Sequence, residues 1–309
     1  MLGVSGRRGP FEAGDLVQLT DPKGRMHTIT LKEGGSFHTH RGRLDHDELI
    51  GRPEGVVARA TSGTAYVALR PLLADYTLSM KRGATIVYPK DAAEILAQAD
   101  IFPGARVLEA GAGSGSLSCW LLRAAGTGGL VSSYERRADF ADIARRNVEG
   151  YFGGPHPAWR LTVGDLGTEL ADSDMDRAVL DMLAPWECLE AVAKALAPGG
   201  LICVYVATTT QVSRIVEAMR AHGGFHEPRS FETLVRTWHV EGLAVRPDHR
   251  MVGHTGFLVT ARRLADGVTV PERRRRPAKG AYGEEWTGAE PPGPDAPPAE
   301  PGDTGPTPL

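Results

Sequence analysis

The chain has 309 residues, of which 41% are hydrophobic and 24% charged, and its formal net charge is −3. These values are ordinary for globular proteins and exclude collagen-like, coiled-coil and wholly disordered chains. No apolar run approaches the ~20 residues that span a bilayer. The first ten residues lack the apolar region of a signal peptide, and three separated cysteines argue against a disulfide framework or zinc ribbon. We therefore expect a cytoplasmic protein of about two domains, with no membrane segment and no bound metal.

The C-terminal stretch differs in composition from the rest of the chain. Residues 290–309 contain eight prolines and four acids but no base, which leaves a net charge of +1 for the remainder. Such a segment buries too little apolar surface to offset its ordering entropy, so we predict a disordered tail over residues 264–309. Its basic run, Arg273–Arg276, is either a solvated linker or a weak electrostatic arm for phosphate backbones.

Residues 1–75 are predicted to form a small β-rich domain. Short apolar segments alternate with turn residues such as Asp21-Pro22-Lys23-Gly24 and Ser62-Gly63. The predicted strands are 16–19, 27–31, 56–59 and 66–69.

Residues 76–263 are predicted to form an α/β domain, because strands alternate with helices from about Tyr88 onward. Strands are predicted at 106–110, 130–134, 160–163, 177–180 and 201–206, and helices at 91–99, 116–125, 138–148 and 211–221. This alternation indicates a parallel sheet covered by helices on both faces. Residues 237–245 and 255–261 are expected to close the sheet as a pair of strands.

A glycine loop, Glu109-Ala110-Gly111-Ala112-Gly113-Ser114-Gly115, lies between the first strand of this domain and the following helix. Open α/β sheets bind their ligands at such a point. A dinucleotide fingerprint requires glycine or alanine where this chain has Ser116, and the Glu109 carboxylate would repel a pyrophosphate. The loop therefore disfavours a nicotinamide-dependent oxidoreductase and favours a ligand with a cationic amine, such as S-adenosylmethionine.

Two further acids end the next two predicted strands. Glu135 is placed to accept hydrogen bonds from both ribose hydroxyls, and Asp165 to accept one from an adenine amino group. Either acid alone has an alternative role as a helix cap or a surface ion-pair partner. Three carboxylates that end three successive strands beside a Gly-x-Gly-x-Gly loop favour an S-adenosylmethionine site.

The segment after the fourth predicted strand is the candidate substrate-facing region. Asp181 again ends a strand, and Pro185-Trp186 offers a rigid apolar surface on which a base can stack. The alternative is that Asp181 caps the following helix and that Trp186 packs in the core. Tyr88 and Tyr205 are the other aromatic residues that line the expected pocket, unless they belong to the core.

Several segments resemble the TrmI family of tRNA (adenine-N1)-methyltransferases, which modify the T-loop adenosine at position 58 of tRNA. The most selective are Tyr88-Pro89-Lys90-Asp91 and Asp181-Met182-Leu183-Ala184-Pro185-Trp186. The other matching segments are the glycine loop, Ser133-Tyr134-Glu135, Val206–Gln211, Gly253–Leu258 and, in the N-terminal domain, Phe37–Gly42. Together they cover roughly residues 10–263.

The resemblance implies a class I Rossmann-like methyltransferase domain behind a small β domain, S-adenosylmethionine as cofactor, tRNA as partner, and a homotetramer. It also implies that Ser114–Leu117, Glu135, Asp165 and Asp181 contact the cofactor or the target base. We expect Asp181, Tyr88 and Tyr205 to be the catalytic residues, the two tyrosines as candidates for holding the base. The expected cofactor-binding residues are Glu109, Gly111, Gly113, Ser114, Gly115, Ser116, Leu117, Glu135, Asp165 and Asp181. Adenine N1 has a free lone pair, so we expect Asp181 to stabilise developing positive charge rather than to remove a proton.

Two other functions remain open: methyl transfer to another acceptor, such as a protein or small molecule, and a non-catalytic tRNA-binding subunit. The Asp181–Trp186 segment and the β-rich domain argue against the first, and the intact glycine loop argues against the second. A cluster of possible metal ligands fits no standard zinc spacing and is better explained by contact with RNA or a neighbouring subunit. It comprises His38, His40, Asp45, His46 and Asp47.

Overall fold

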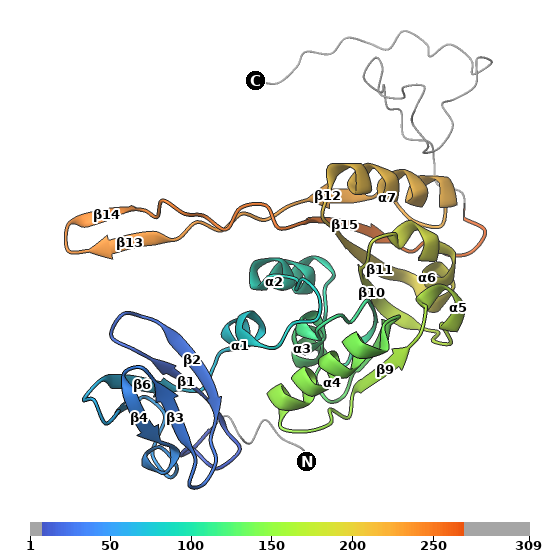
Figure 1. Ribbon diagram of the computed structural model, residues 1–309. Helices are drawn as coiled ribbons and strands as arrows, with labels where there is room; N and C mark the ends of the chain where they lie inside the picture. The colour runs from blue at the N-terminus through green and yellow to red at the C-terminus, as the bar shows by residue number, and fades with distance from the viewer. Residues whose placement is uncertain (1–7, 269–309) are drawn as a thin grey trace.

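The computed structural model describes residues 8–268, which form two regions and a projecting hairpin (Figure 1). The N-terminal region contains an antiparallel sheet in the order β2-β1-β6-β5. Its strands are β1 (Leu16–Thr20), β2 (Met26–Thr30), β5 (Val56–Arg59) and β6 (Ala65–Leu69). A second hairpin, β3 (Ser36–Thr39) and β4 (Gly42–Asp45), leads into a short 3-10 helix, η2 (His46–Glu48). Phe11, Leu19 and Tyr66 are fully buried in the small core that these strands enclose.

The second region is built on a seven-stranded sheet in the order β12-β15-β11-β10-β7-β8-β9. Its strands are β7 (Arg106–Ala110), β8 (Leu130–Glu135), β9 (Trp159–Val163), β10 (Met175–Asp181), β11 (Leu196–Val206), β12 (Arg229–Phe231) and β15 (Phe257–Arg262). The five strands from β9 to β11 are parallel, and β15 is antiparallel to both of its neighbours. The predicted α/β, Rossmann-like fold with an N-terminal β region is confirmed.

Helices cover both faces of this sheet. The helices are α1 (Leu73–Ser79), α2 (Pro89–Gln98), α3 (Ser116–Ala125), α4 (Ala138–Phe152), α5 (Leu166–Glu169), α6 (Leu189–Ala195) and α7 (Thr209–His222), with a 3-10 turn, η3 (Pro185–Cys188), before α6. Alternate strand residues face opposite sides, so Val107 and Val179 pack with α1–α4 while Leu108 and Leu180 pack with α5–α7. Among residues 8–268, no helix is both long and apolar enough to cross a membrane.

The expectation that residues 237–245 pair with 255–261 is wrong. The sheet neighbour of β15 on that side is β12, and residues 237–245 instead begin a separate hairpin, β13 (Trp238–Glu241) with β14 (Ala244–Pro247). This hairpin extends away from the sheet in Figure 1. The alternation of apolar and polar residues predicted a strand correctly, but it does not identify the strand's partner. We call residues 232–256 the arm.

The domain border at residue 75 stays a prediction, and this position falls within helix α1. Helix α1 begins at Leu73, and its buried Leu73 and Tyr76 side chains belong to the same core cluster as α3 and the large sheet. Most of the predicted tail, including the Arg273–Arg276 run, lies outside the described residues.

Candidate functional site

The candidate residues gather at the carboxyl edge of the parallel strands, on the face covered by α1–α4. Glu109 of β7 lies in register with Ser133 of β8 and Val179 of β10. Because side chains alternate along a strand, Glu135 and Asp181 lie on the same face as Glu109, two residues further toward this edge. A row therefore runs across the edge from Glu135, past the glycine loop, to Asp181.

Gly111 lies in the middle of this row, between the two acids. Its amide donates to the Asp181 carbonyl oxygen at 3.1 Å. A Cβ at this position would lie 3.3 Å from Glu135 Oε2 and 3.6 Å from the Asp181 carbonyl oxygen. The absence of a side chain thus leaves space between two carboxyl-bearing residues, where a ligand can approach the backbone.

Glu109 lies beneath the glycine loop and is completely buried. Its Oε2 accepts hydrogen bonds from the Ser118 hydroxyl of α3 at 2.7 Å and from the Ser133 hydroxyl of β8, while Oε1 is buried with no hydrogen-bond partner. Burial raises the pKa of Glu109 to about 7, against the lowering effect of the two serine hydrogen bonds. The carboxyl group thus ties α3 and β8 to β7, and its contact with an ammonium group remains a prediction.

Glu135 holds the glycine loop directly. Its Oε2 accepts from the Gly113 amide at 2.8 Å and its Oε1 from the Arg137 amide at 3.0 Å. Both carboxylate oxygens lie at the cofactor-facing edge that the sequence predicts for a ribose contact. A ligand hydroxyl that donates to Oε2 would therefore either share this oxygen with the Gly113 amide or take the place of that amide.

The loop leads into α3 through residues that are almost all buried. Gly115 adopts a left-handed conformation, with φ of +76°, and the first helical residues Ser116 and Leu117 are buried. The Ser114 hydroxyl accepts from the Gly83 amide at 3.0 Å, which fastens the loop to the segment before α2. The Ser116 hydroxyl oxygen is buried with no hydrogen-bond partner. Amides at a helix N-terminus together with such an unused hydroxyl suit a polar ligand.

Asp181 ends β10 as predicted, and the part of the chain that the structure describes provides its side chain with no hydrogen-bond partner. Burial, followed by the negative charges of Glu109 and Glu135, raises the pKa of Asp181 to about 7. Glu109 and Glu135 thus disfavour the ionisation of Asp181, so a positively charged ligand is electrostatically suited to this site.

Tyr205 adjoins Asp181, and Tyr88 lies close enough to Tyr205 to influence its ionisation. Tyr205 of β11 lies in register with Asp181, and its hydroxyl donates to the Thr255 carbonyl oxygen at 2.8 Å. Burial raises the pKa of Tyr205, and the charges of Asp91, Asp181 and Tyr88 raise it further. The structure therefore brings Asp181 and Tyr205 together on β10 and β11, and Tyr88, directly before α2, lies near Tyr205.

Asp165 performs both of the structural roles considered as alternatives. Its Oδ1 accepts from the Gly167 amide at 2.8 Å and caps α5, while its Oδ2 pairs with Arg136 at 3.3 Å. The side chain is 40% exposed. An adenine contact by this residue remains a prediction.

Trp186 lies on the opposite side of the sheet from Tyr205. Its ring packs against the cluster formed with α5–α7, and the Arg214 guanidinium covers the ring at 4.1 Å from the centroid. The alternative of core packing therefore describes this residue better than a base-stacking surface. Trp186 belongs to the 3-10 turn η3 that follows Ala184.

A buried polar cluster beside the site was not anticipated from the sequence. The Lys90 ammonium pairs with Asp91 at 2.6 Å and donates to the Thr255 hydroxyl at 2.6 Å and the Thr233 carbonyl oxygen at 2.7 Å. The Lys90 side chain is 6% exposed, so it is not a free phosphate contact. The cluster anchors the arm to α2, and its members are too distant in sequence for spacing to reveal.

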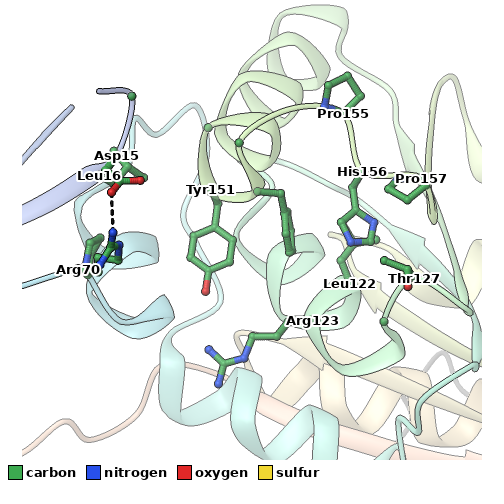
Figure 2. A pocket seen from close by; sticks show the side chains of 16 residues that line it. Asp15, Leu16, Arg70, Leu122, Arg123, Thr127, Tyr151, Pro155, His156 and Pro157 are labelled. Atoms are coloured by element: carbon green, nitrogen blue, oxygen red, sulfur yellow. Dashed lines mark hydrogen bonds and ion pairs between the residues drawn. The ribbon is translucent and has the colours of Figure 1, made fainter. Parts of the chain in front are cut away.

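A cavity of about 500 Å³ lies elsewhere, between the N-terminal region and the opposite edge of the sheet (Figure 2). Leu16, Arg70, Tyr151 and His156 line it, and Arg70 pairs there with Asp15 at 2.6 Å. Some of its lining residues directly precede β8 and β9 and so lie at the amino ends of these strands, whereas the acid row lies at the carboxyl edge of the sheet. The cavity is therefore separate from the acid row.

The histidine-rich cluster of the N-terminal region is engaged in local hydrogen bonds. His46 Nδ1 accepts from the Lys32 amide at 3.0 Å, and the Asp47 carboxylate accepts from the Gly34 amide at 3.0 Å. Within residues 8–268, no group of three or more histidine, cysteine, aspartate or glutamate side chains could hold a metal ion.

Two family models match the chain. The model described as "TrmI-like N-terminal" matches residues 9–58, and the model described as "tRNA methyltransferase complex GCD14 subunit" matches residues 65–246. These ranges correspond to the small antiparallel region and to most of the α/β region.

Individual proteins match over similar spans. The tRNA (adenine(58)-N(1))-methyltransferase TrmI of Thermus thermophilus is 42% identical over 246 residues, which are 79% of this chain and 95% of that protein. The crystal structure of tRNA (m1A58) methyltransferase TrmI from Aquifex aeolicus covers 83% of this chain and 100% of its own, with 28% identity and a TM-score of 0.72. A Thermotoga maritima structure described as a SAM-dependent O-methyltransferase covers 89% and 98%, with 29% identity and a TM-score of 0.79.

Proposed function

Because this chain belongs to the family described as the tRNA methyltransferase complex GCD14 subunit, we propose that it methylates N1 of adenosine 58 in tRNA. The methyl donor is S-adenosylmethionine and the product is 1-methyladenosine. The observation that carries the proposal is the row at the carboxyl edge, where Asp181 lies beside the glycine loop and in register with Tyr205. We also propose a cytoplasmic location, where such a protein would meet its tRNA substrate.

The residues at this edge fit S-adenosylmethionine, which supplies an electrophilic methyl group on a sulfonium cation. Glu135 and the space above Gly111 suit the ribose and the adjoining chain of the cofactor, and the Ser116 hydroxyl offers a further polar contact. The mutual repulsion of Glu109, Glu135 and Asp181 decreases when positive charge enters the site. Asp165, at the end of β9, remains the proposed adenine contact.

We propose that Asp181 contributes to catalysis as a carboxylate that stabilises positive charge, not as a proton donor. Adenine N1 attacks through an in-plane lone pair, so no proton must leave before the methyl group is transferred. The ring becomes cationic in the transition state, and a carboxylate beside its exocyclic amine stabilises that charge. Tyr88 and Tyr205 hold the base in line for attack, since correct orientation supplies a large part of such a rate enhancement.

The arm supports the proposal that the protein assembles as a homotetramer. Trp238, Val240 and Val245 are 59%, 68% and 57% exposed, and Val240 lies directly opposite Val245 on the hairpin. The other face carries polar residues such as His239 and Arg246. A two-stranded hairpin is marginally stable alone in water. A second copy of the chain would bury this apolar face.

The activity is tested with purified protein, labelled S-adenosylmethionine and an unmodified tRNA transcript, followed by nucleoside analysis. We expect 1-methyladenosine, and we expect it to disappear with a transcript in which adenosine 58 is replaced. Product that persists after this replacement would move the reaction to another position in tRNA.

A second candidate acceptor follows from the Thermotoga maritima neighbour, which is described as an O-methyltransferase. Binding of S-adenosylmethionine without any methylation of tRNA would favour this alternative. If neither cofactor binding nor methylation occurs while tRNA still binds, the chain is a non-catalytic tRNA-binding subunit.

A further inference from the structure

The loop that follows Asp181 presents an exposed leucine next to the acid row. Leu183 is 85% exposed, although Met182 before it packs partly against the core and Pro185 after it is buried. Single exposed apolar residues are common on protein surfaces. This one is distinctive because it lies two residues from the proposed catalytic acid.

The backbone that carries Leu183 is held in place. The Gln211 side-chain amide donates to the Leu183 carbonyl oxygen at 3.0 Å. Gln211 is itself held by the capping box at the start of α7, where its Oε1 accepts from the Thr208 amide at 3.1 Å. The Leu183 side chain thus projects from a braced loop rather than from a free one.

Adenosine methylation at N1 demands that the base leave its stack. N1 lies on the Watson–Crick edge of a base that is stacked within the folded T-loop, and enzymes that react with such atoms extrude the target nucleotide. Proteins that unstack bases commonly insert an apolar side chain between base steps. Trp186 is not available for this role, because its ring packs against the core and lies under Arg214.

We propose that Leu183 is a wedge that enters the base stack of the tRNA T-loop and occupies the space from which the target adenosine is extruded. This proposal rests on the proposed function. Leu183 acts as a positioning residue: it forms no bond in the reaction, and it stabilises the tRNA conformation in which the adenosine reaches Asp181.

The test compares Leu183→Ala with the wild type on two tRNA transcripts. One transcript is natural, and the other has abasic sites on both sides of the target adenosine, so that no stack must be opened. We expect kcat/KM of Leu183→Ala to fall about tenfold on the natural transcript, the magnitude expected when one leucine side chain is no longer buried in the complex with tRNA. On the abasic transcript, kcat/KM should equal the wild-type value. Leu183→Met should retain most of the activity, since it preserves apolar bulk.

Leu72→Ala is the matched control, because Leu72 is another exposed leucine (69%) outside the site. A second measurement uses a transcript with 2-aminopurine at the target position, whose fluorescence rises on unstacking. The rise should be smaller with Leu183→Ala than with the wild type or Leu72→Ala.

Equal losses on both transcripts, or no loss on either, would overturn the wedge. A change in the molecular mass of Leu183→Ala in solution would also overturn it, by identifying Leu183 as a contact between copies of the chain. If the wild type methylates neither transcript, the proposed function fails instead, and the fluorescence comparison still decides whether Leu183 unstacks the base.

Discussion

Within residues 8–268, the carboxyl edge of the sheet and the arm each leave some side-chain groups without a partner, but these groups are of opposite kinds. At the edge, the groups are acids in a buried place, and burial together with mutual repulsion raises the pKa of Asp181. On the arm, the groups are apolar side chains in water, such as Trp238 and Val240. The first arrangement suits a small cationic ligand, and the second suits a protein surface. Changes at each region should therefore produce separate defects.

Replacement of Asp181 should have the largest effect. We expect Asp181→Ala to lower kcat by about 10²–10³-fold, the magnitude typical of losing one group that stabilises transition-state charge. The fold should persist, because the substitution removes a carboxyl group that Glu109 and Glu135 repel. Steady-state kinetics and thermal unfolding measure the two quantities, and kinetics close to wild type would remove Asp181 from the mechanism.

Gly256→Ala tests the place where the arm rejoins the site. A Cβ at Gly256 would lie 2.3 Å from Tyr205 Cζ, so the tyrosine ring must move. We expect kcat to fall about tenfold, because small displacements of positioning groups are costly. Gly253→Ala is the matched control, since a Cβ there meets nothing within 4 Å. Equal kinetics in both variants would argue against a role of Tyr205 in orienting the base.

The double substitution Trp238→Asp with Val240→Asp tests the arm alone. Two charges on its apolar face should prevent burial against another copy and reduce the molecular mass in solution from that of the proposed tetramer. S-adenosylmethionine affinity should change less than about threefold, since these residues lie outside the acid row. Light scattering and calorimetry measure the two quantities, and Val57→Asp, at another exposed valine, is the control. Unchanged mass would assign the apolar face to a different partner.

The pH dependence should give the smallest effect. The Asp181 pKa of about 7 means that its carboxylate fraction rises about threefold between pH 6.5 and 7.5. We expect kcat/KM for S-adenosylmethionine to rise with pH through this window by a similar factor. A fall over the same range would contradict a role for the ionised form.

The same shift has a consequence for stability. Between about pH 4 and 7, folded Asp181 keeps a proton that the unfolded chain has lost, so this group makes the fold less stable as pH rises and has a constant effect above pH 7. Asp181→Asn without cofactor should therefore gain thermal stability relative to wild type at pH 8, and less at pH 5.

The sequence predicted the edge well because its residues obey local rules. A strand followed by a glycine loop and a helix places Glu109 and Gly111 with little freedom, and the parallel order of strands brings Glu135 and Asp181 beside them. Asp165 and Trp186 were harder to predict. An aspartate at a strand end can cap the following helix as readily as it can bind a ligand, and Asp165 caps α5. Trp186 lies in the 3-10 turn η3, and the local sequence does not show on which face of the sheet its ring packs.

The sequence by itself determined the α/β class, the small β region, the glycine loop and the row of acids, because alternation and strand ends are properties of neighbouring residues. Only the tertiary structure decided the arm and its anchor. Pairing of β15 with β12 instead of residues 237–245, and the contact of Lys90 with Thr255, join segments far apart in the chain. These contacts are stabilised by the shared core and by the ion pair and hydrogen bonds of the buried Lys90 ammonium, which no local pattern encodes.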